Sequence, residues 1–472
     1  MNTKLYVYKK DLYKDKIEKG YLNKEAAKVV EYKNAIILPP KKESNTTFDG
    51  IFKGGIVTED FTFITGKQRH QNPKFNYSCY DSYKVEDEIK ESKEEVIFGG
   101  IIMDHFGHAI LETFSRLWYV VKNKKDTRKI AFIKYAEIRN YHYELLRLMG
   151  LPKERIIIIE EPTKFKSILI PDETIQAWGE FKKEYTYIYE EISKNVEKKN
   201  EKKIYLTRTQ LEERFDCNEE YFEEFYKKRG YKIIAPEKLS VEDQIAYLSG
   251  CEDLVCTLGT LSHLALFMKK GSKLTILNRT PNNVLEPQLI IDEAKKLKVI
   301  YVDALLNILP SPHTAGCVCM YPNELFKEYL IDNKIDFEEN ELEVDKEKII
   351  MEYIKKWTLN FSKPNRFGTI ANYDICDVVI NLYNSLNEDK IDVPKIYTGT
   401  GKKSKRYWIE NSNKLDDELN KVKLENKKLE NKIKKLEKDL KSEKEKLKKI
   451  KKSKSWKITE PLRKFKRIFL KK

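Results

Sequence analysis

The stretch Met103–Val120, MDHFGHAILETFSRLWYV, carries more titratable side chains than a helix needs if it only packs a core. His108, Glu112 and Arg116 are four residues apart, so on a helix they lie along one stripe. A carboxylate one turn from a histidine orients the imidazole ring and raises its basicity, which suits a general base. The spacing therefore predicts acid–base chemistry here. A set of core or capping side chains is the alternative.

Two further candidates precede this helix. Asp104 and His105 follow the apolar run EVIFGGII, which predicts a buried strand. Open α/β sheets place their sites beyond the carboxyl ends of strands, so both side chains are catalytic candidates, with Asp104 or Glu112 as the alternative base to His108. The H-x-x-H spacing lacks the E-x-x-H and H-E-x-x-H patterns of metal sites, so we expect no metal ligand here.

A second stretch, DLVCTLGTLSHLALF, predicts a strand that ends at Thr257 and a helix that starts near Thr260. Gly259 lets the backbone come close to a ligand, and the free N–H groups of a helix start bind phosphate. Ser262 and His263 add a hydroxyl and an imidazole, and with Thr260 they suit a diphosphate. Thr and Ser are also ordinary helix caps, which is the alternative.

A third candidate is Arg208, at the end of the strand KIYLTR. An arginine at a strand end can make a forked contact with phosphate, and a surface salt bridge is the alternative. The sequence contains neither G-x-x-x-x-G-K-[ST] nor G-x-G-x-x-G, which speaks against a P-loop NTPase and a standard dinucleotide enzyme. It also lacks a convincing Asp-x-Asp pair at a strand end, which speaks against a metal-bound nucleotide.

Apolar runs alternate with amphipathic helices twice along the chain, which indicates parallel sheets covered on both faces. The sequence therefore predicts an α/β protein with two Rossmann-like, doubly wound domains, a cleft between them and a C-terminal coiled coil. The expected segments are an α/β domain with a β-rich start at 1–180, a second α/β domain at 200–310, a helical extension packed on the core at 311–400, a coiled coil at 410–452 and a basic amphipathic helix at 453–472.

The coiled-coil segment has the clearest periodicity. Its seam follows spacings of four and three over five heptads, and the single Asn426 at an a position favours a parallel dimer. A lone solvated helix is the alternative. The seam residues are Leu415, Leu419, Val422, Asn426, Leu429, Ile433, Leu436, Leu440, Glu443, Leu447 and Ile450.

The last segment, 453–472, has one apolar and one basic face. Ile458, Leu462, Phe465 and Phe469 recur at spacings of four, three and four, while Lys and Arg occupy the other face. A helix of this kind lies in the headgroup region of an anionic membrane. We therefore expect membrane-surface binding, with docking on the protein's own body as the alternative.

Charge is spread unevenly over the 472 residues. The formal net charge is +15, and residues 402–472 hold 28 Lys and Arg against 11 Asp and Glu, which leaves the first 401 residues at about −2. A nearly neutral body speaks against nucleic-acid binding. Seven scattered cysteines, no apolar leader and no run of about 20 apolar residues predict a cytoplasmic protein that is peripheral on the inner face of the membrane.

Three stretches together resemble one family. GH…LE…RLW, YLTR and KRGYKIIAPEKLSVEDQIAYLSGCEDLVCTLGTLSHLALFMKKGSKLTIL occur in the order seen in the bacterial branch of glycosyltransferase family 61, over about residues 95–280. The terminal SWKITEPLRK also resembles a tail of bacterial surface-polysaccharide glycosyltransferases. The residues that match the family's His, acidic residue, Arg, strand-end Arg and phosphate-loop Gly are His108, Glu112, Arg116, Arg208 and Gly259.

The resemblance implies a GT-B-like fold and inverting transfer from a nucleotide sugar, often UDP-linked, without a metal or other cofactor. Residues 1–180 would then serve the acceptor and 200–310 the donor. The acceptor would be a cell-surface glycan or a lipid-linked glycan. Many members carry His directly before the phosphate-loop Gly, where this chain has Leu258, and His263 follows later. The rival functions are a non-catalytic, dimeric, membrane-tethered scaffold and a nucleic-acid binder that uses the tail.

Overall fold

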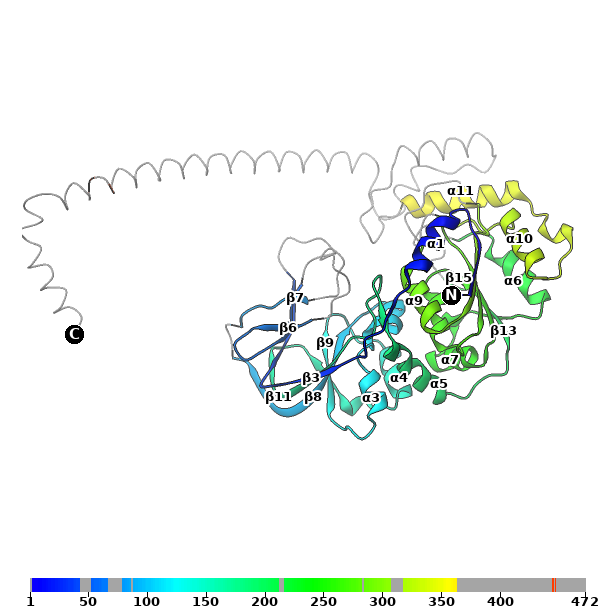
Figure 1. Cartoon of the computed structure of the whole chain (residues 1–472). Helices are drawn as coiled ribbons and strands as arrows, with labels where there is room; N and C mark the ends of the chain where they lie inside the picture. Colours follow the sequence, from blue (N-terminus) through cyan, green and yellow to red (C-terminus); the bar gives the residue numbers. More distant parts are fainter. Residues whose placement is uncertain are drawn as a thin grey trace, which may run out of the picture. The chain divides into compact units, whose positions relative to one another are not determined.

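The computed structural model describes residues 2–42, 52–66, 79–85, 88–211, 216–281, 284–306 and 317–362, together with residues 444 and 446. Those up to 362 fall in one compact unit, which Figure 1 shows as two α/β regions. The predicted basic helix at 453–472 lies outside the described residues. So do nearly all of the predicted coiled coil at 410–452 and much of the extension at 311–400. Within the described part, no helix is long and apolar enough to cross a membrane.

One sheet is wholly parallel. In spatial order its strands are β14 (Lys232–Ile234), β13 (Lys203–Leu206), β15 (Asp253–Thr257), β16 (Lys273–Leu277), β17 (Lys298–Val302) and β1 (Asn2–Tyr6). The five strands from β13 onward take the order 2-1-3-4-5 of a doubly wound fold. The direction of winding reverses between β13 and β15, which is where such folds bind ligands.

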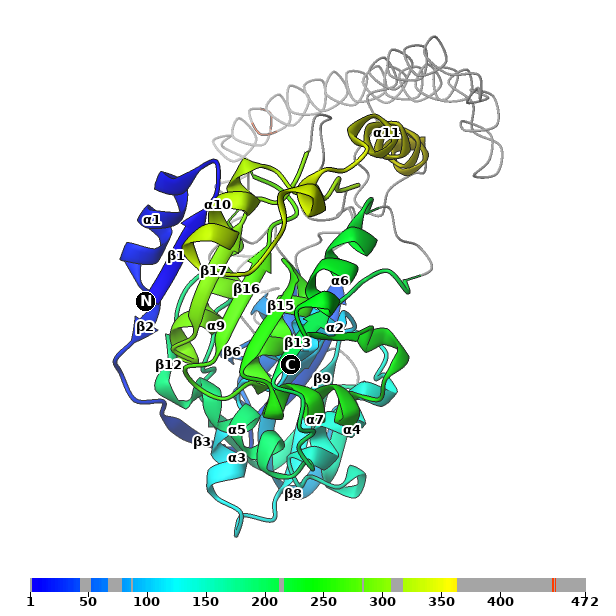
Figure 2. The same cartoon turned by 90° about the vertical axis from the view of Figure 1, so that its right-hand side faces the viewer.

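Helices cover both faces of this sheet (Figure 2). The two faces alternate along each strand, so that Ile204 and Leu206 face one core while Tyr205 faces the other. One core lies under α1 (Lys10–Lys19), α7 (Val241–Gly250) and α9 (Glu286–Ala294). The other lies under α6 (Glu219–Lys228) and α10 (Glu324–Asp332), and α11 (Lys346–Ser362) follows in the chain. Because helices cover both faces of the sheet, a ligand site is expected at the ends of its strands.

The other large sheet is mixed. Its strands, in spatial order, are β10 (Ile156–Ile159), β9 (Lys129–Lys134), β8 (Lys90–Ile102), β11 (Thr163–Pro171), β4 (Ile36–Lys42), β5 (Phe52–Val57) and β6 (Phe63–Thr65), with β3 (Val29–Lys33) on β11 and β7 (Cys79–Asp81) on β5. The first four are mutually parallel, and β3 and β4 pair antiparallel with β11. The parallel part carries α4 (Asn140–Leu148), and α5 (Tyr187–Lys194) leads to the other sheet.

The mixed α/β class is confirmed, but the first domain is not a purely parallel sheet. Antiparallel pairing joins β11 to β3 and to β4, β4 to β5, and β5 to β6. The apolar run of β8, by contrast, is buried from Val96 to Ile102, as expected of a central parallel strand. Figure 1 shows β8 and β9 toward α3 (Trp118–Lys122) and α4, with β6 and β7 at the other end of the sheet.

The first residues differ from the predicted segment 1–180, because β1 extends the second sheet through parallel pairing with β17. The Tyr8 amide donates to Asp303 Oδ2 at 2.8 Å, and Lys16 on α1 forms an ion pair with Glu286 on α9 at 2.5 Å. The chain reaches the first sheet only afterwards, through β2 (Leu22–Asn23), which pairs with β12 (Phe181–Lys182). Without β1, the main-chain N–H and C=O groups along this edge of β17 would lack strand partners. β1 supplies those partners.

The predicted single helix over Met103–Val120 is also different. The structure has a short α2 (Phe106–His108), a π-helical turn η1 (Ala109–Thr113), four residues of turn and then α3. All residues from 109 to 118 are buried, so the segment has no solvent face that would give it an amphipathic period. π-Helical turns are rare in proteins, and those that occur are often found at functional sites.

Candidate active site

His108 and Glu112 form a hydrogen-bonded pair at the start of the π-helical turn. His108 Nδ1 lies 2.9 Å from Glu112 Oε1. Glu112 is 1% exposed, whereas a quarter of the His108 side chain is exposed. A buried carboxylate therefore orients the imidazole ring, which is the arrangement of a general base and its orienting group.

Asp104 and His105 stand at the carboxyl end of β8, as predicted. Asp104 is held by Arg139, with Nε–Oδ1 at 2.6 Å and Nη2–Oδ2 at 3.0 Å, and this pair raises the pKa of Arg139. A carboxylate in a forked contact with a guanidinium is a weak base. His105 is exposed, and its ring centroid lies 5.2 Å from that of His108.

The second stretch folds as a sharp loop and a single helical turn. β15 ends at Thr257, and Gly259 has φ 129°, a conformation that favours glycine. Ser262 Oγ donates to the Gly259 carbonyl at 2.8 Å and accepts from the Gly259 amide at 3.2 Å, so it caps the loop. The helix α8 (Thr260–His263) continues only as the 3₁₀ turn η5 (Leu264–Phe267), so its dipole is far smaller than that of a long helix.

The two stretches meet. α2 contacts α8, and a Cβ built on Gly107 would lie 2.8 Å from Thr260 Oγ1, so Gly107 permits this close approach. The charges of His108, His105 and Glu112 all influence His263. Predicted residues that are about 150 positions apart in the sequence therefore form one site at the carboxyl ends of β8 and β15. The Thr257 hydroxyl is buried below it and has no hydrogen-bond partner among the described residues.

His263 is buried, and its Nδ1 lies 3.0 Å from Gln288 Oε1 on α9. Burial lowers the pKa of His263 to about 4, and the charges of His108 and His105 act in the same direction. The hydrogen bond to Gln288 raises the pKa and offsets only part of this decrease. The ring is therefore neutral at pH 7.

Arg208 is at the carboxyl end of β13, as predicted, and shares a buried carboxylate with an arginine that the sequence analysis did not select. Arg208 Nε lies 3.6 Å from Asp216 Oδ2, and Arg279 Nη2 lies 3.0 Å from Asp216 Oδ1. Arg279 follows β16, so the two arginines flank the end of β15, where Gly259 lies. Two guanidinium groups thus lie next to the loop, and guanidinium groups suit an anionic ligand.

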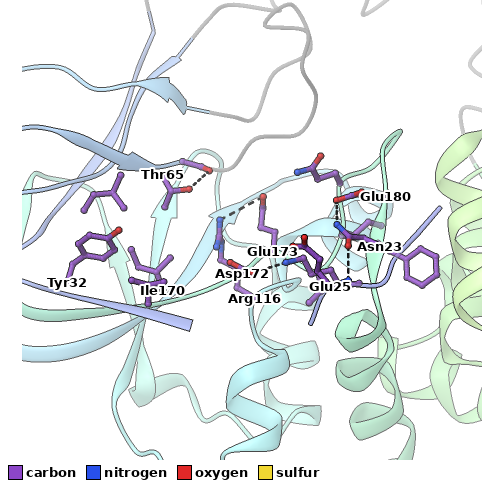
Figure 3. A pocket seen from close by; sticks show the side chains of 17 residues that line it. Asn23, Glu25, Tyr32, Thr65, Arg116, Ile170, Asp172, Glu173 and Glu180 are labelled. Carbon is purple, nitrogen blue, oxygen red and sulfur yellow. Dashed lines mark hydrogen bonds and ion pairs between the residues drawn. The ribbon is translucent and has the colours of Figure 1, made fainter. Parts of the chain in front are cut away.

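Arg116 does not join this group. Its guanidinium is buried, donates to the Pro171 carbonyl, and lies 3.8 Å from Glu173 and 5.2 Å from the centre of the Phe98 ring. It lines a pocket of about 570 Å³ at the end of β11, where Figure 3 shows it near Asp172 and Glu173. The irregular turn after η1 rotates Arg116 away from the stripe that an ideal helix would share with His108 and Glu112.

Trp178 is a second residue that the sequence analysis did not select. It lies in the turn between Ile175 and Phe181, which pair as an antiparallel bridge, and its φ is 66°. Such a conformation is costly for a bulky side chain, and outliers of this kind cluster at functional sites. The half-buried Trp178 ring lies 6.4 Å from the His108 ring, centroid to centroid.

Metal ligands do not gather in the described part of the chain: no group of three or more His, Cys, Asp or Glu side chains there could hold a metal ion. The cationic groups beside the phosphate-loop candidate are arginines.

A protein-family model described as Glycosyltransferase 61 matches residues 106–275. The matched segment runs from α2 into β16 and includes the His108–Glu112 pair, Arg208 and the loop after β15. The match supports an enzyme class: the protein is a glycosyltransferase. No curated protein matches the chain in sequence.

Among solved structures, the chain is similar to a dodecameric iron-containing heptosyltransferase, TibC, crystallised in complex with ADP-D-beta-D-heptose. The identity is 10%, the likeness covers 56% of this chain and 78% of that chain, and the TM-score is 0.24.

Proposed function

We propose that the protein is an inverting, metal-independent glycosyltransferase of GT-B-like layout. It moves a sugar from a nucleotide-sugar donor, with UDP-linked sugars as the first choice, to a cell-surface glycan or glycolipid. One observation carries the proposal. The close approach of Gly107 to Thr260 brings the His108–Glu112 pair to the loop after β15, at the point where the second sheet reverses its winding.

His108 takes the proton of the acceptor hydroxyl in this proposal. Its Nδ1–H donates to Glu112, so Nε2 carries the lone pair, and the buried carboxylate stabilises the imidazolium that forms. The acceptor oxygen attacks the anomeric carbon as the bond from that carbon to the diphosphate breaks. One displacement of this kind inverts the anomeric centre.

The donor diphosphate lies beside Arg208, Arg279 and the Gly259–Thr260 backbone. The arginines balance the charge of the departing nucleoside diphosphate, and Gly259 lets the backbone approach it because a Cβ there meets no protein atom within 4 Å in the described part of the chain. These cations do the work that a metal ion does in other transferases.

The acceptor sugar lies on the side of His108 where Trp178 is. An aromatic ring offers a sugar an apolar face for stacking, and Trp178 keeps its ring beside the base at the cost of an unfavourable backbone conformation.

For the remainder of the chain the proposal follows the sequence pattern. Residues 410–452 form a parallel dimeric coiled coil, and residues 453–472 bind the anionic inner surface of the cytoplasmic membrane. Two membrane-binding helices on one dimer add their affinities and keep the enzyme near a lipid-linked acceptor.

A thermal-shift panel tests the donor site directly. The intact protein is heated with UDP, GDP, CDP, CMP or TDP in the presence of EDTA, and Arg208→Ala is measured in parallel. The proposal expects one nucleotide, UDP first, to raise the melting temperature of the intact protein and not of the variant. No shift with any nucleotide, with or without added Mg²⁺ or Mn²⁺, would contradict it.

A further inference from the structure

A buried chain of hydrogen bonds runs from His263 into the core of the second sheet. His263 Nδ1 lies 3.0 Å from Gln288 Oε1, and Gln288 Nε2 donates to Asp292 Oδ1 at 2.8 Å. The Tyr301 hydroxyl donates to Asp292 Oδ2 at 2.6 Å. All four side chains are buried, and they come from α8, α9 and β17. The chain thus links the candidate site to the centre of the fold.

The directions of these bonds fix the histidine's tautomer. Once Asp292 is ionised, above its pKa of about 7, it accepts at both of its oxygens, so Gln288 must turn its NH₂ group toward Asp292 and its oxygen toward His263. An amide oxygen only accepts, which means that His263 Nδ1 carries a proton and donates it. A neutral imidazole has one such proton, so its Nε2 is an acceptor.

Nε2 lies on the ring edge opposite Nδ1 and therefore points away from α9. No partner for Nε2 occurs among the described residues, and the charged groups that influence His263 from elsewhere are His108, His105 and Glu112. Burial lowers the pKa of His263 to about 4, so the ring does not become cationic at neutral pH. The site therefore receives a lone pair from His263, where the sequence had suggested an imidazole suited to a diphosphate.

We propose that Gln288, Asp292 and Tyr301 are positioning residues that hold His263 as a neutral imidazole protonated at Nδ1. Its Nε2 accepts a hydrogen bond from a hydroxyl group of the sugar substrate and makes no contact with phosphate. A lone pair attracts a hydroxyl proton and repels phosphate oxygen, whereas the arginines beside Asp216 have the opposite preference. The hydroxyl half of this proposal rests on the proposed function, and the tautomer half does not.

The tautomer is tested by magic-angle-spinning NMR of the full chain with ¹⁵N-labelled histidine at about pH 8.5, where Asp292 is ionised, with the His263 signals identified by their loss in His263→Asn. The proposal expects a protonated Nδ1 and an unprotonated Nε2. Gln288→Met and Asp292→Asn should each mix the tautomers, and either variant alone decides the matter if the other does not fold. An imidazolium, the reverse tautomer, or an unchanged spectrum in both variants would overturn the proposal.

Tyr13 supplies a matched control. Its ring packs against Tyr301 with centroids 4.9 Å apart, and it is equally buried, but Asp292 accepts from Tyr301 and not from Tyr13. Tyr13→Phe removes a hydroxyl from the same tyrosine pair and should leave the His263 signals unchanged. If Tyr13→Phe mixes the tautomers as Asp292→Asn does, general loosening of the core is responsible and the positioning role is wrong.

The hydroxyl half is tested by calorimetric titration with UDP and by turnover of a UDP-sugar. His263→Asn should bind UDP within about twofold of the wild type and lower turnover about tenfold or more, because one hydrogen bond of about 1.4 kcal/mol to the sugar is lost. A tenfold or greater loss of UDP affinity would place His263 on the phosphate and overturn this half. If the wild type binds no nucleoside diphosphate, the proposed function and this half fail together, while the NMR result still decides the tautomer.

Discussion

The site contains two histidines that each lie at a short helical turn and have opposite environments. His108 is partly exposed and pairs with a buried carboxylate, Glu112, whereas His263 is buried and pairs with an amide, Gln288. Burial lowers the pKa of His263 to about 4, although its hydrogen bond to Gln288 acts in the opposite direction. In the proposed mechanism the same side chain serves as a base in one region and as a neutral hydrogen-bond acceptor in the other, and burial separates the two roles.

The largest expected effect is a loss of turnover when the His108–Glu112 pair is disrupted. His108→Ala or Glu112→Gln should lower the turnover of transfer by about 10²–10⁴, because the acceptor hydroxyl loses its proton acceptor or that acceptor loses its partner. The affinity for the nucleoside diphosphate should stay within about twofold. Initial rates and calorimetry on the same preparations measure both quantities.

Glu190→Gln is the matched control, since Glu190 accepts a hydrogen bond at 2.9 Å from Thr186, four residues earlier, and no histidine is involved. Unchanged turnover in His108→Ala would remove His108 from the role of base and make Glu112 the next candidate.

A smaller effect, on nucleoside diphosphate binding, is expected when the arginine next to the loop is substituted. Arg279→Ala should weaken nucleoside diphosphate binding by about ten- to a hundredfold, because a hydrogen bond to a charged group contributes about 1.5–3 kcal/mol. Arg229→Ala is the control, since Arg229 also holds a carboxylate, Glu341, at 2.6 Å, but faces the amino ends of the strands. Equal losses in both variants, measured by titration, would mean that general destabilisation and not phosphate contact is the cause.

Trp178 should act on the acceptor alone. Trp178→Ala is expected to raise the KM for the acceptor about tenfold, because stacking of an aromatic ring contributes about 0.5–1.5 kcal/mol beyond its buried area. The KM for the donor should not change, and Trp178→Phe should restore most of the acceptor affinity. An equal rise in both KM values, in steady-state kinetics with each substrate varied, would contradict a role in acceptor binding.

The smallest effect is on the pH dependence of stability. Burial raises the pKa of Asp292 to about 7, so the folded state retains a proton that the unfolded chain releases near pH 4, and stability falls as pH rises from about 4 to 7. Burial lowers the pKa of His263 to about 4, so stability falls as pH drops from about 6.5 to 4. The two slopes oppose each other, each at up to about 1.4 kcal/mol per pH unit.

Asp292→Asn removes the first of these slopes. Its melting temperature should fall between about pH 6.5 and 4.5, while that of the wild type stays nearly constant, and His263→Asn should show the opposite slope. Parallel melting curves for Asp292→Asn and the wild type over this range would contradict the assigned ionisation states.

The sequence was most informative at the ends of buried parallel strands. Arg208 and the loop from Thr257 to Gly259 could be located because continuous apolar runs reveal such strands and the polar residues after them. Arg279 gives the same signal, after the run KLTIL, and could have been found in this way. Gln288 could not have been found in this way, because in the sequence it is an ordinary polar residue of a helix. Its contact with His263 depends on the packing of α9 on α8.

Local distortions limited the prediction elsewhere. Arg116 was expected beside Glu112 because an ideal helix places them four residues apart, and the π-helical turn followed by non-helical turns removes that relation. Trp178 adopts a left-handed conformation that sequence preferences assign to Gly or Asn, so nothing in its neighbourhood indicates it. The position of β1 on the second sheet depends on long-range pairing, which local pattern does not encode.

The central claim is that the His108–Glu112 pair acts on a donor held by the second sheet. The most direct measurement is the release of UDP from a panel of UDP-sugars, in EDTA and with glycan or glycolipid acceptors present, by the intact protein and by His108→Ala. The account predicts release from at least one UDP-sugar by the intact protein and a loss of at least about a hundredfold in the variant. Equal release by both proteins, or none from any sugar nucleotide, would contradict it.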